Sequence, residues 1–228
     1  MTNSKVNIKV ELKLWGIYFV TILLSTFFHE LGHCTIAWTH GFSAVPTPAK
    51  AYLMESIPST LNNYFALGGI ISSLVFPLIL FTFVIASSFR LNSAILAGGI
   101  AMPGMYSLRF LVIGRGHDAT EFQEAQSALG VNYSGHFLDW LFSTLFLMGI
   151  FLWAFKSKPN YKIAGRILIG FVLTFIFILL LQKINNLIFD PIFSAYENHF
   201  KNIQMLIQTH QPTMHCQNLQ QDVVAISI

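Results

Sequence analysis

Three residues near the start of the chain have the types and the spacing of a metal-dependent hydrolytic site. His29, Glu30 and His33 form an H-E-x-x-H pattern. Residues four apart on a helix lie on one face, so both imidazoles can bind one tetrahedral Zn²⁺. Glu30 directly follows the first histidine, where it can take a proton from a water at the metal and deliver it to a leaving amine. The spacing therefore predicts Zn²⁺ on His29 and His33, with Glu30 as the catalytic base.

The setting of this pattern strengthens the prediction. It lies in an apolar run from about Leu14 to Trp38, and ionisable groups inside a membrane helix are costly and usually functional. Gly32 keeps the helix surface low, so we expect a second helix to approach closely there. Two other interpretations are a pair of core histidines hydrogen-bonded to Glu30 and a bis-histidine haem site. The first must hide three titratable groups without a metal, and the second leaves Glu30 without a role.

A catalytic zinc site needs a further protein ligand. Asp118, just after the third apolar run, is the first choice, because the first and third helices of an alternating bundle end at the same membrane face. His117 is the adjacent substitute or a partner that orients the ligand. Asp139, at the start of the fourth run, ranks third, with His136 behind it. Asp118 has an alternative role as the N-cap of the segment that follows it.

The composition excludes a water-soluble domain. Of the 228 residues, 10% are charged and 54% are hydrophobic, and the mean hydropathy is +0.60; a soluble domain carries roughly 25% charged residues. The apolar content excludes a disordered chain, and the scattered lysines and arginines exclude a nucleic-acid-binding one. Cys34 lies in an apolar run, where we expect it to act as a small hydrophobic residue. The sequence predicts an integral, multi-pass membrane protein.

Five apolar segments are long enough to cross a bilayer, which needs roughly 20 residues each. The predicted fold is therefore an all-α polytopic membrane protein, with the H-E-x-x-H pattern in the first of about five helices. That first segment is too long for a cleaved signal peptide and contains polar residues. The five segments run from about Leu14 to Trp38, Tyr64 to Phe89, Leu91 to Ile113, Phe137 to Phe155, and Ile163 to Phe189.

The connections between these segments suggest further features. Residues 39–61 contain Pro46, Pro48 and Pro58, which predict a loop or strand-like excursion. Asp190-Pro191 is expected to end the fifth helix. We accordingly divide the chain into a helical bundle, residues 1–190, and a polar C-terminal tail, residues 191–228. Arg109, within the third run, is expected to reach the membrane interface or to pair with a carboxylate.

Lysine and arginine positions indicate the orientation in the membrane. With the N-terminus inside, eight of these cations fall on the cytoplasmic side and five on the outer side. The largest group lies in the short connection between the fourth and fifth segments. The count favours a cytoplasmic N-terminus, which would place the H-E-x-x-H pattern nearer the opposite face.

The sequence resembles the site-2-protease family of intramembrane zinc metallopeptidases. The resemblance covers roughly residues 14–120 and rests on residues 28–33, on Gly116-His117-Asp118, and on Gly68-Gly69, which resembles a small-residue turn of that family. The resemblance implies hydrolysis of a peptide bond in or near a transmembrane helix of a substrate. It also implies zinc bound by His29, His33 and Asp118, with Glu30 as base. The family's usual Leu-Asp-Gly motif does not occur in this chain.

The family resemblance also gives residues 41–60 a role, because it implies a membrane-associated loop whose edge pairs with an unwound substrate strand. The expected partners are a membrane protein substrate and the lipid bilayer, and no nucleic acid; the sequence does not specify an oligomeric state. Two other functions are open: a non-proteolytic zinc-binding membrane scaffold and a metal transporter. An intact Glu30 argues against the scaffold, and the scarcity of further ligands in the other helices argues against the transporter.

Overall fold

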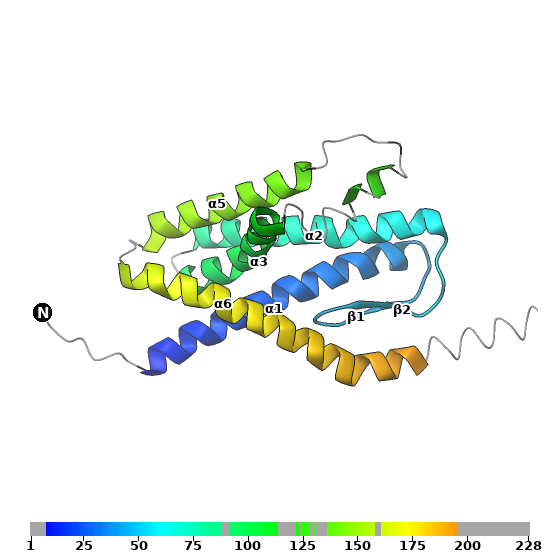
Figure 1. The fold of residues 1–228 in the computed structure, drawn as a ribbon, viewed down its shortest axis with the longest axis horizontal. Helices are drawn as coiled ribbons and strands as arrows, with labels where there is room; N and C mark the ends of the chain where they lie inside the picture. The colour runs from blue at the N-terminus through cyan, green and yellow to red at the C-terminus, as the bar shows by residue number, and fades with distance from the viewer. Residues whose placement is uncertain are drawn as a thin grey trace, which may run out of the picture.

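The computed structural model describes residues 8–87, 92–113, 122–123, 125–127, 130, 136–157 and 161–195. Helices dominate these residues, together with one small antiparallel sheet (Figure 1). In chain order the elements are α1 (Ile8–Thr39), β1 (Ala44–Pro46), β2 (Ala51–Leu53), α2 (Ser59–Ala86), α3 (Asn92–Ile113), α5 (Phe137–Ser157), α6 (Tyr161–Ile184) and the π-helix η1 (Asn185–Phe189).

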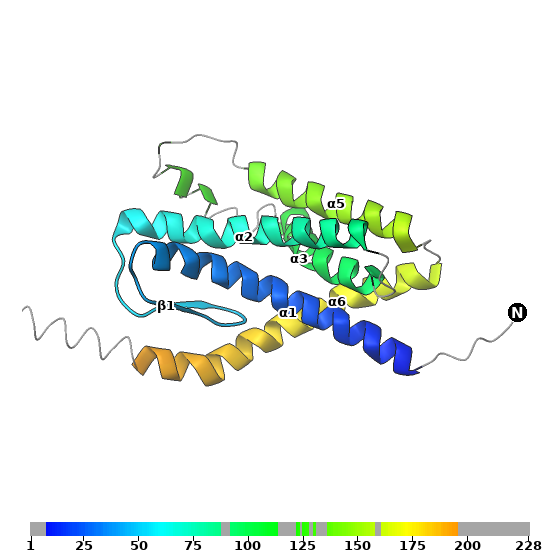
Figure 2. The ribbon, with the colours of Figure 1, turned by 180° about the vertical axis from the view of Figure 1, so that it is seen from behind.

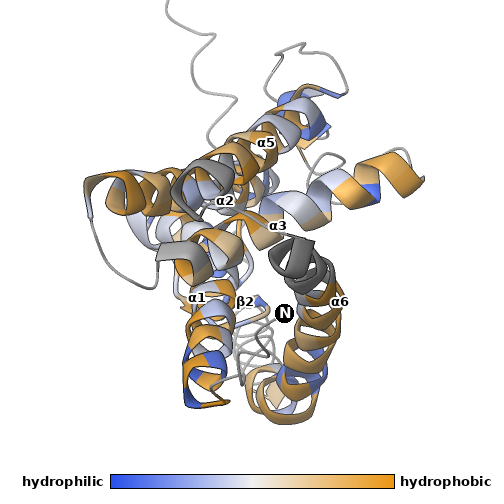
Figure 3. Ribbon diagram, turned by 90° about the vertical axis from the view of Figure 1, so that its left-hand side faces the viewer, coloured by the Kyte–Doolittle hydropathy of each residue, from blue (hydrophilic) through white to orange (hydrophobic). Residues whose placement is uncertain are grey.

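Four helices in the described residues are long and apolar enough to cross a membrane, judged by length and composition. The helix predicted as the fourth span is α5, which is apolar over the described stretch Phe137–Trp153. Large apolar side chains cover the outside of the bundle: Leu111 is 79% exposed and Phe151 is 74% exposed. Figure 3 shows apolar residues along most of α5 and α6. The all-α polytopic prediction is therefore confirmed, with four such helices among the described residues. The four are Ile8–Thr39, Ser59–Ala86, Ala94–Val112 and Val172–Ala195.

The core forms where α1 packs on α2 and α3, and where α3 packs on α5 (Figures 1 and 2). α3 runs unbroken through Pro103, whose carbonyl accepts a hydrogen bond from Ser107 Oγ at 2.8 Å. Cys34 is fully buried with Ala37 and Ala44 between α1 and β1, which confirms its expected apolar role. The largest buried cluster joins α2, α3 and α5 through Phe81, Val84, Leu96, Ile100, Leu145 and Trp153.

The predicted excursion between the first two spans is confirmed as a β-hairpin. β1 and β2 pair antiparallel, in the register Ala44↔Leu53, Val45↔Tyr52 and Pro46↔Ala51. Trp38, near the end of α1, donates its indole N–H to the Ala44 carbonyl at 2.9 Å, which fastens β1 to the helix. Figures 1 and 2 both show the hairpin lying between α1 and α6.

The predicted helix end at Asp190-Pro191 is wrong, because the chain stays helical to residue 195. Proline removes a backbone donor, and its ring collides with the carbonyl four residues earlier in a regular α-helix. Here η1 precedes Pro191, and the Asp190 N–H donates to the Asn185 carbonyl, five residues back. This wider turn makes room for the proline ring. The ribbon bends at this point, where α6 passes into the orange segment (Figure 1).

Candidate metal centre

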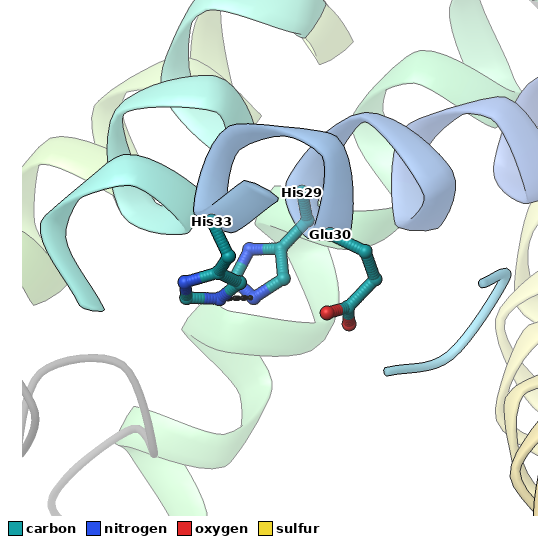
Figure 4. A group of neighbouring side chains, drawn as sticks. All are labelled: His29, Glu30 and His33. Carbon is teal, nitrogen blue, oxygen red and sulfur yellow. Dashed lines mark hydrogen bonds between the residues drawn. The ribbon is translucent and has the colours of Figure 1, made fainter. Parts of the chain in front are cut away.

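α1 carries all three residues of the H-E-x-x-H pattern. His29, Glu30 and His33 lie ten to six residues before its last residue, Thr39, in a stretch without proline. Because residues 29 and 33 are separated by about one helical turn, both imidazoles project from the same face. Figure 4 shows the two rings converging, with the Glu30 carboxylate beside them. These residues form a group that could hold a metal ion, with one ligand atom from each within 4.8 Å of the others.

The two histidines converge through the same ring atom. Their Nε2 atoms lie 3.1 Å apart, and the rings are nearly perpendicular, with centroids 4.7 Å apart. Two ligands of a tetrahedral Zn²⁺ with Zn–N bonds of 2.0–2.1 Å stand roughly 3.3 Å apart. The Nε2 pair therefore fits two positions of such an ion with little movement of either ring.

The opposite nitrogen of each imidazole is bound to α2. His33 Nδ1–H donates to the Phe65 carbonyl at 2.6 Å, and His29 Nδ1 bonds Ser73 Oγ at 2.7 Å. A carbonyl oxygen only accepts, so the proton of a neutral His33 sits on Nδ1 and its Nε2 presents a lone pair. Partners of this kind orient metal-binding histidines and fix their tautomer. α2 thus orients both rings with their Nε2 atoms facing each other; because His33 Nε2 accepts, the proton between them belongs to His29 Nε2, and a bound metal would take its place.

Three glycines allow α1 and α2 to come close enough for these bonds. A Cβ on Gly32 would overlap the Gly68 carbonyl oxygen, and a Cβ on Gly68 would overlap that of Gly32. A Cβ on Gly69 would overlap the His33 imidazole. The expected close approach at Gly32 is confirmed. Gly68 and Gly69 lie inside α2, where they leave space for the other backbone and for a metal-binding ring.

Glu30 is half-buried and lines the same cavity as the two imidazoles. Its carboxylate belongs to the group that could hold a metal, and Figure 4 shows it beside the converging rings rather than between them. Two roles follow from this geometry. The carboxylate could bind the ion directly, or it could accept a proton from a water held next to the ion.

A cavity of about 740 Å³ surrounds the group. Its walls come from α1, from the hairpin tip at residues 48–51, and from α2, α3 and α6. Arg109 lines it from α3 and is exposed, a position that the sequence did not indicate. Pockets that bind drug-sized ligands measure roughly 300–1,000 Å³. The space therefore admits a segment of polypeptide rather than only a metal and water.

The structure describes only two of the four candidates for the further metal ligand. Asp118 and His117 lie outside the described residues. Asp139 is in the first turn of α5, where it is 4% exposed and its Oδ2 lies 3.3 Å from His136 Nδ1. Neither Asp139 nor His136 lines the cavity. Among the described residues, the group that could hold a metal contains His29, Glu30 and His33 alone.

Sequence reasoning missed a polar network that joins the hairpin to η1. Thr47 Oγ1–H has two acceptors in reach, Asn185 Oδ1 and the Lys50 carbonyl, and Asn185 Nδ2–H donates to the Tyr52 hydroxyl at 2.6 Å. Tyr52 donates in turn to Asp190 Oδ1 at 2.6 Å, and Lys50 Nζ lies 3.1 Å from the same oxygen. Burial and the hydrogen bond to Asp190 raise the pKa of the Tyr52 phenol, so it stays a donor at neutral pH. The one signal in the sequence was two asparagines in an apolar run.

Comparisons with protein-family models, with curated proteins and with solved structures gave no match for this chain.

Proposed function

We propose that this chain is a zinc-dependent intramembrane endopeptidase of the site-2-protease family, an integral multi-pass protein that cleaves membrane proteins in or near their transmembrane segments. One observation carries most of the proposal. The Nε2 atoms of His29 and His33 lie 3.1 Å apart beside Glu30, and each opposite nitrogen is bound to α2. This arrangement lies in a helix that is long and apolar enough to cross a membrane.

The nitrogen ligands favour zinc as the metal, because imidazole binds Zn²⁺ well. Two histidines four residues apart on a regular helix can occupy two of its four tetrahedral positions. Bound Zn²⁺ would supply a Lewis acid and would lower the pKa of water towards neutrality. The protein does the rest: Phe65 and Ser73 keep the imidazoles oriented. Glu30 takes the proton of the attacking water and returns it to the leaving amine. Asp118 is our proposed third ligand, with His117, Asp139 and His136 as the alternatives.

The geometry of the hairpin is evidence in favour of a polypeptide substrate. In the described residues the sheet has two strands, so each has an outer edge. Thr47 N–H donates to the Lys50 carbonyl and Met54 N–H to the Ser43 carbonyl, each at 3.0 Å. Because hydrogen-bonded pairs alternate along an antiparallel ladder, the backbone groups of Ala51 point to the outer edge of β2.

The two outer edges of the hairpin differ in the backbone groups that a substrate strand could bond. On β1, the Ala44 carbonyl already accepts the Trp38 indole N–H, and Pro46 has no N–H to give. On β2, Ala51 lines the cavity that holds the histidines. A peptide must be extended before its bond can be attacked, and pairing with a strand edge holds it extended. We therefore propose that a substrate strand pairs with the Ala51 edge of β2.

The test compares the full chain in detergent with Glu30→Gln and His33→Ala. Glu11→Gln and His40→Ala are matched controls, because both residues lie on α1 or just after it and outside the cavity. Zinc content is measured together with cleavage of a panel of single-span membrane proteins. We expect near one zinc per chain in the wild type and in Glu30→Gln. We also expect Glu30→Gln to lower cleavage by at least about 100-fold, and His33→Ala to lose both zinc and cleavage.

Each other outcome favours a different function. Zinc bound without cleavage of any substrate would favour the membrane scaffold. Metal flux in proteoliposomes without a cleavage product would favour the transporter. A wild type that binds no zinc would exclude all metal-dependent readings of His29 and His33.

A further inference from the structure

The polar network between the hairpin and η1 ends beside the metal centre. Thr47 and Lys50 flank residues 48 and 49, which line the cavity together with Lys50 itself. The partners of Thr47 and Lys50 are Asn185 and Asp190, about 140 residues later in the chain. The tip of the hairpin is therefore fastened to the helix that supplies another wall of the cavity.

The central members of this network are buried and hydrogen-bonded to one another. Asn185 is 2% exposed and Thr47 is 3% exposed, and Tyr52 is buried beside them. The Asn185 amide accepts from Thr47 with its oxygen and donates to Tyr52 with its nitrogen. A buried amide without partners is costly, and more so in a helix that is apolar enough to cross a membrane. The hairpin thus supplies the bonds that Asn185 cannot obtain from its own helix.

The π-helix brings both anchoring residues to the same side. In a regular α-helix, side chains five residues apart point roughly 140° away from each other. In η1 the Asp190 N–H instead donates to the Asn185 carbonyl, so residues 185 and 190 stack one above the other. Both side chains then reach Tyr52 of the hairpin. π-turns of this kind occur often at functional sites.

We propose that Asn185 and Asp190 are positioning residues, which hold the hairpin tip and the Ala51 edge at a fixed place beside the metal centre. The inference rests on the proposed function for its effect on cleavage, because a positioned edge matters only if a substrate strand pairs with it. Neither residue touches the reacting atoms. Loss of either one frees the hairpin tip, raises the KM for membrane substrates, and leaves zinc binding unchanged.

The first readout is the accessibility of the hairpin tip, which does not depend on catalysis. Ala49→Cys is introduced into the full chain with Cys34→Ala and Cys216→Ala, and the thiol is labelled with a water-soluble maleimide. We expect Asn185→Leu and Asp190→Ala each to speed labelling by at least about fivefold, because each leaves hydrogen-bonding groups of the hairpin without partners. Lys183→Met is the matched control, since this exposed residue of α6 lies outside the network and the cavity.

The second readout separates positioning from a general loss of stability. We expect Asn185→Leu to raise KM by about tenfold with kcat changed less, and with zinc still near one per chain. Thr47→Val added to Asn185→Leu costs only the bond that Thr47 Oγ1 also makes to the Lys50 carbonyl, because the contact between the two side chains is already lost. Wild-type labelling and wild-type KM in both Asn185→Leu and Asp190→Ala would overturn the proposal.

The proposal can still be tested if one variant fails to fold or if the wild type is inactive. If Asn185→Leu does not fold, the Asp190→Ala variant is used alone, because Asp190 is partly exposed. Labelling of Asp190→Ala at the wild-type rate then overturns the proposal, and faster labelling supports it. If the wild type cleaves no substrate, the proposed function fails, but faster labelling still establishes that the network holds the hairpin. Cleavage by the wild type with unchanged labelling in the variants would overturn this inference alone.

Discussion

The cavity has a first wall built by α1 and α2 and a second wall built by the hairpin and α6. The two elements of each wall are joined by different kinds of contact. Between α1 and α2, backbone meets backbone at Gly32 and Gly68, and the histidine bonds run to α2. Between the hairpin and α6, the contact is made by polar side chains, from Thr47 to Asn185 and from Tyr52 to Asp190.

This difference suits two different proposed roles: the first wall holds the metal site, and the second wall binds the substrate. Packed helix backbones leave no room for a ring to move, which suits a metal site that needs fixed ligand geometry. A hairpin held by side-chain hydrogen bonds can be altered without moving the packed helices, so the edge proposed to receive a polypeptide can be tested separately from the metal site. Changes to the first wall should therefore remove zinc, and changes to the second should alter substrate binding with zinc in place.

Among substitutions outside His29, Glu30 and His33, the largest effect is expected from Gly69→Ala, which disrupts the first wall. The added Cβ overlaps the His33 imidazole, so the ring must leave its place beside Phe65. We expect zinc affinity to fall by about 10–100-fold, the range seen when partners of metal-binding residues are lost. Competition with a zinc-binding dye measures it. Gly16→Ala is the control, because nothing lies within 4 Å of a Cβ there; equal affinities in the two variants would contradict the account of the first wall.

A smaller effect, confined to cleavage, is expected from Ala51→Pro in the second wall. Proline removes the N–H that points to the outer edge of β2, and it spares the bonds between β1 and β2. We expect kcat/KM for membrane substrates to fall by about tenfold, since one backbone hydrogen bond to the substrate is lost and the strand edge is disturbed. Zinc content should stay at the wild-type value.

Ala51→Val is the matched control for this change, because it adds bulk but keeps the N–H. Cleavage by Ala51→Pro at the rate of Ala51→Val would show that the substrate does not pair with this edge.

The smallest effect is expected from Lys50→Met, also in the second wall. The Lys50 side chain is 54% exposed, and its pair with Asp190 lies at the surface. Exposed ion pairs contribute little to stability, so we expect less than about a fivefold change in kcat/KM. Steady-state kinetics with one membrane substrate suffices to measure it. A loss as large as that of Asn185→Leu would mean that the exposed ion pair, rather than the buried amide, holds the hairpin.

Some of the structure followed from local sequence alone. Apolar runs predicted the helices, and prolines predicted the non-helical stretch that became the hairpin. Gly32 predicted the close approach of a second helix. One prediction was wrong: Pro191 does not end its helix. The reason is that a π-turn five residues long precedes the proline and makes room for it, and no local rule places such a turn.

The sequence by itself determined the face on which His29 and His33 lie, because four residues make about one turn of any α-helix. It also determined the chemistry of that face, through two imidazoles and a carboxylate within five residues. Only the tertiary structure decided that Ser73 and the Phe65 carbonyl orient the rings, and that Asn185 holds the hairpin. These contacts join residues 32 to 138 positions apart, so they depend on how the helices cross rather than on the spacing within any one of them.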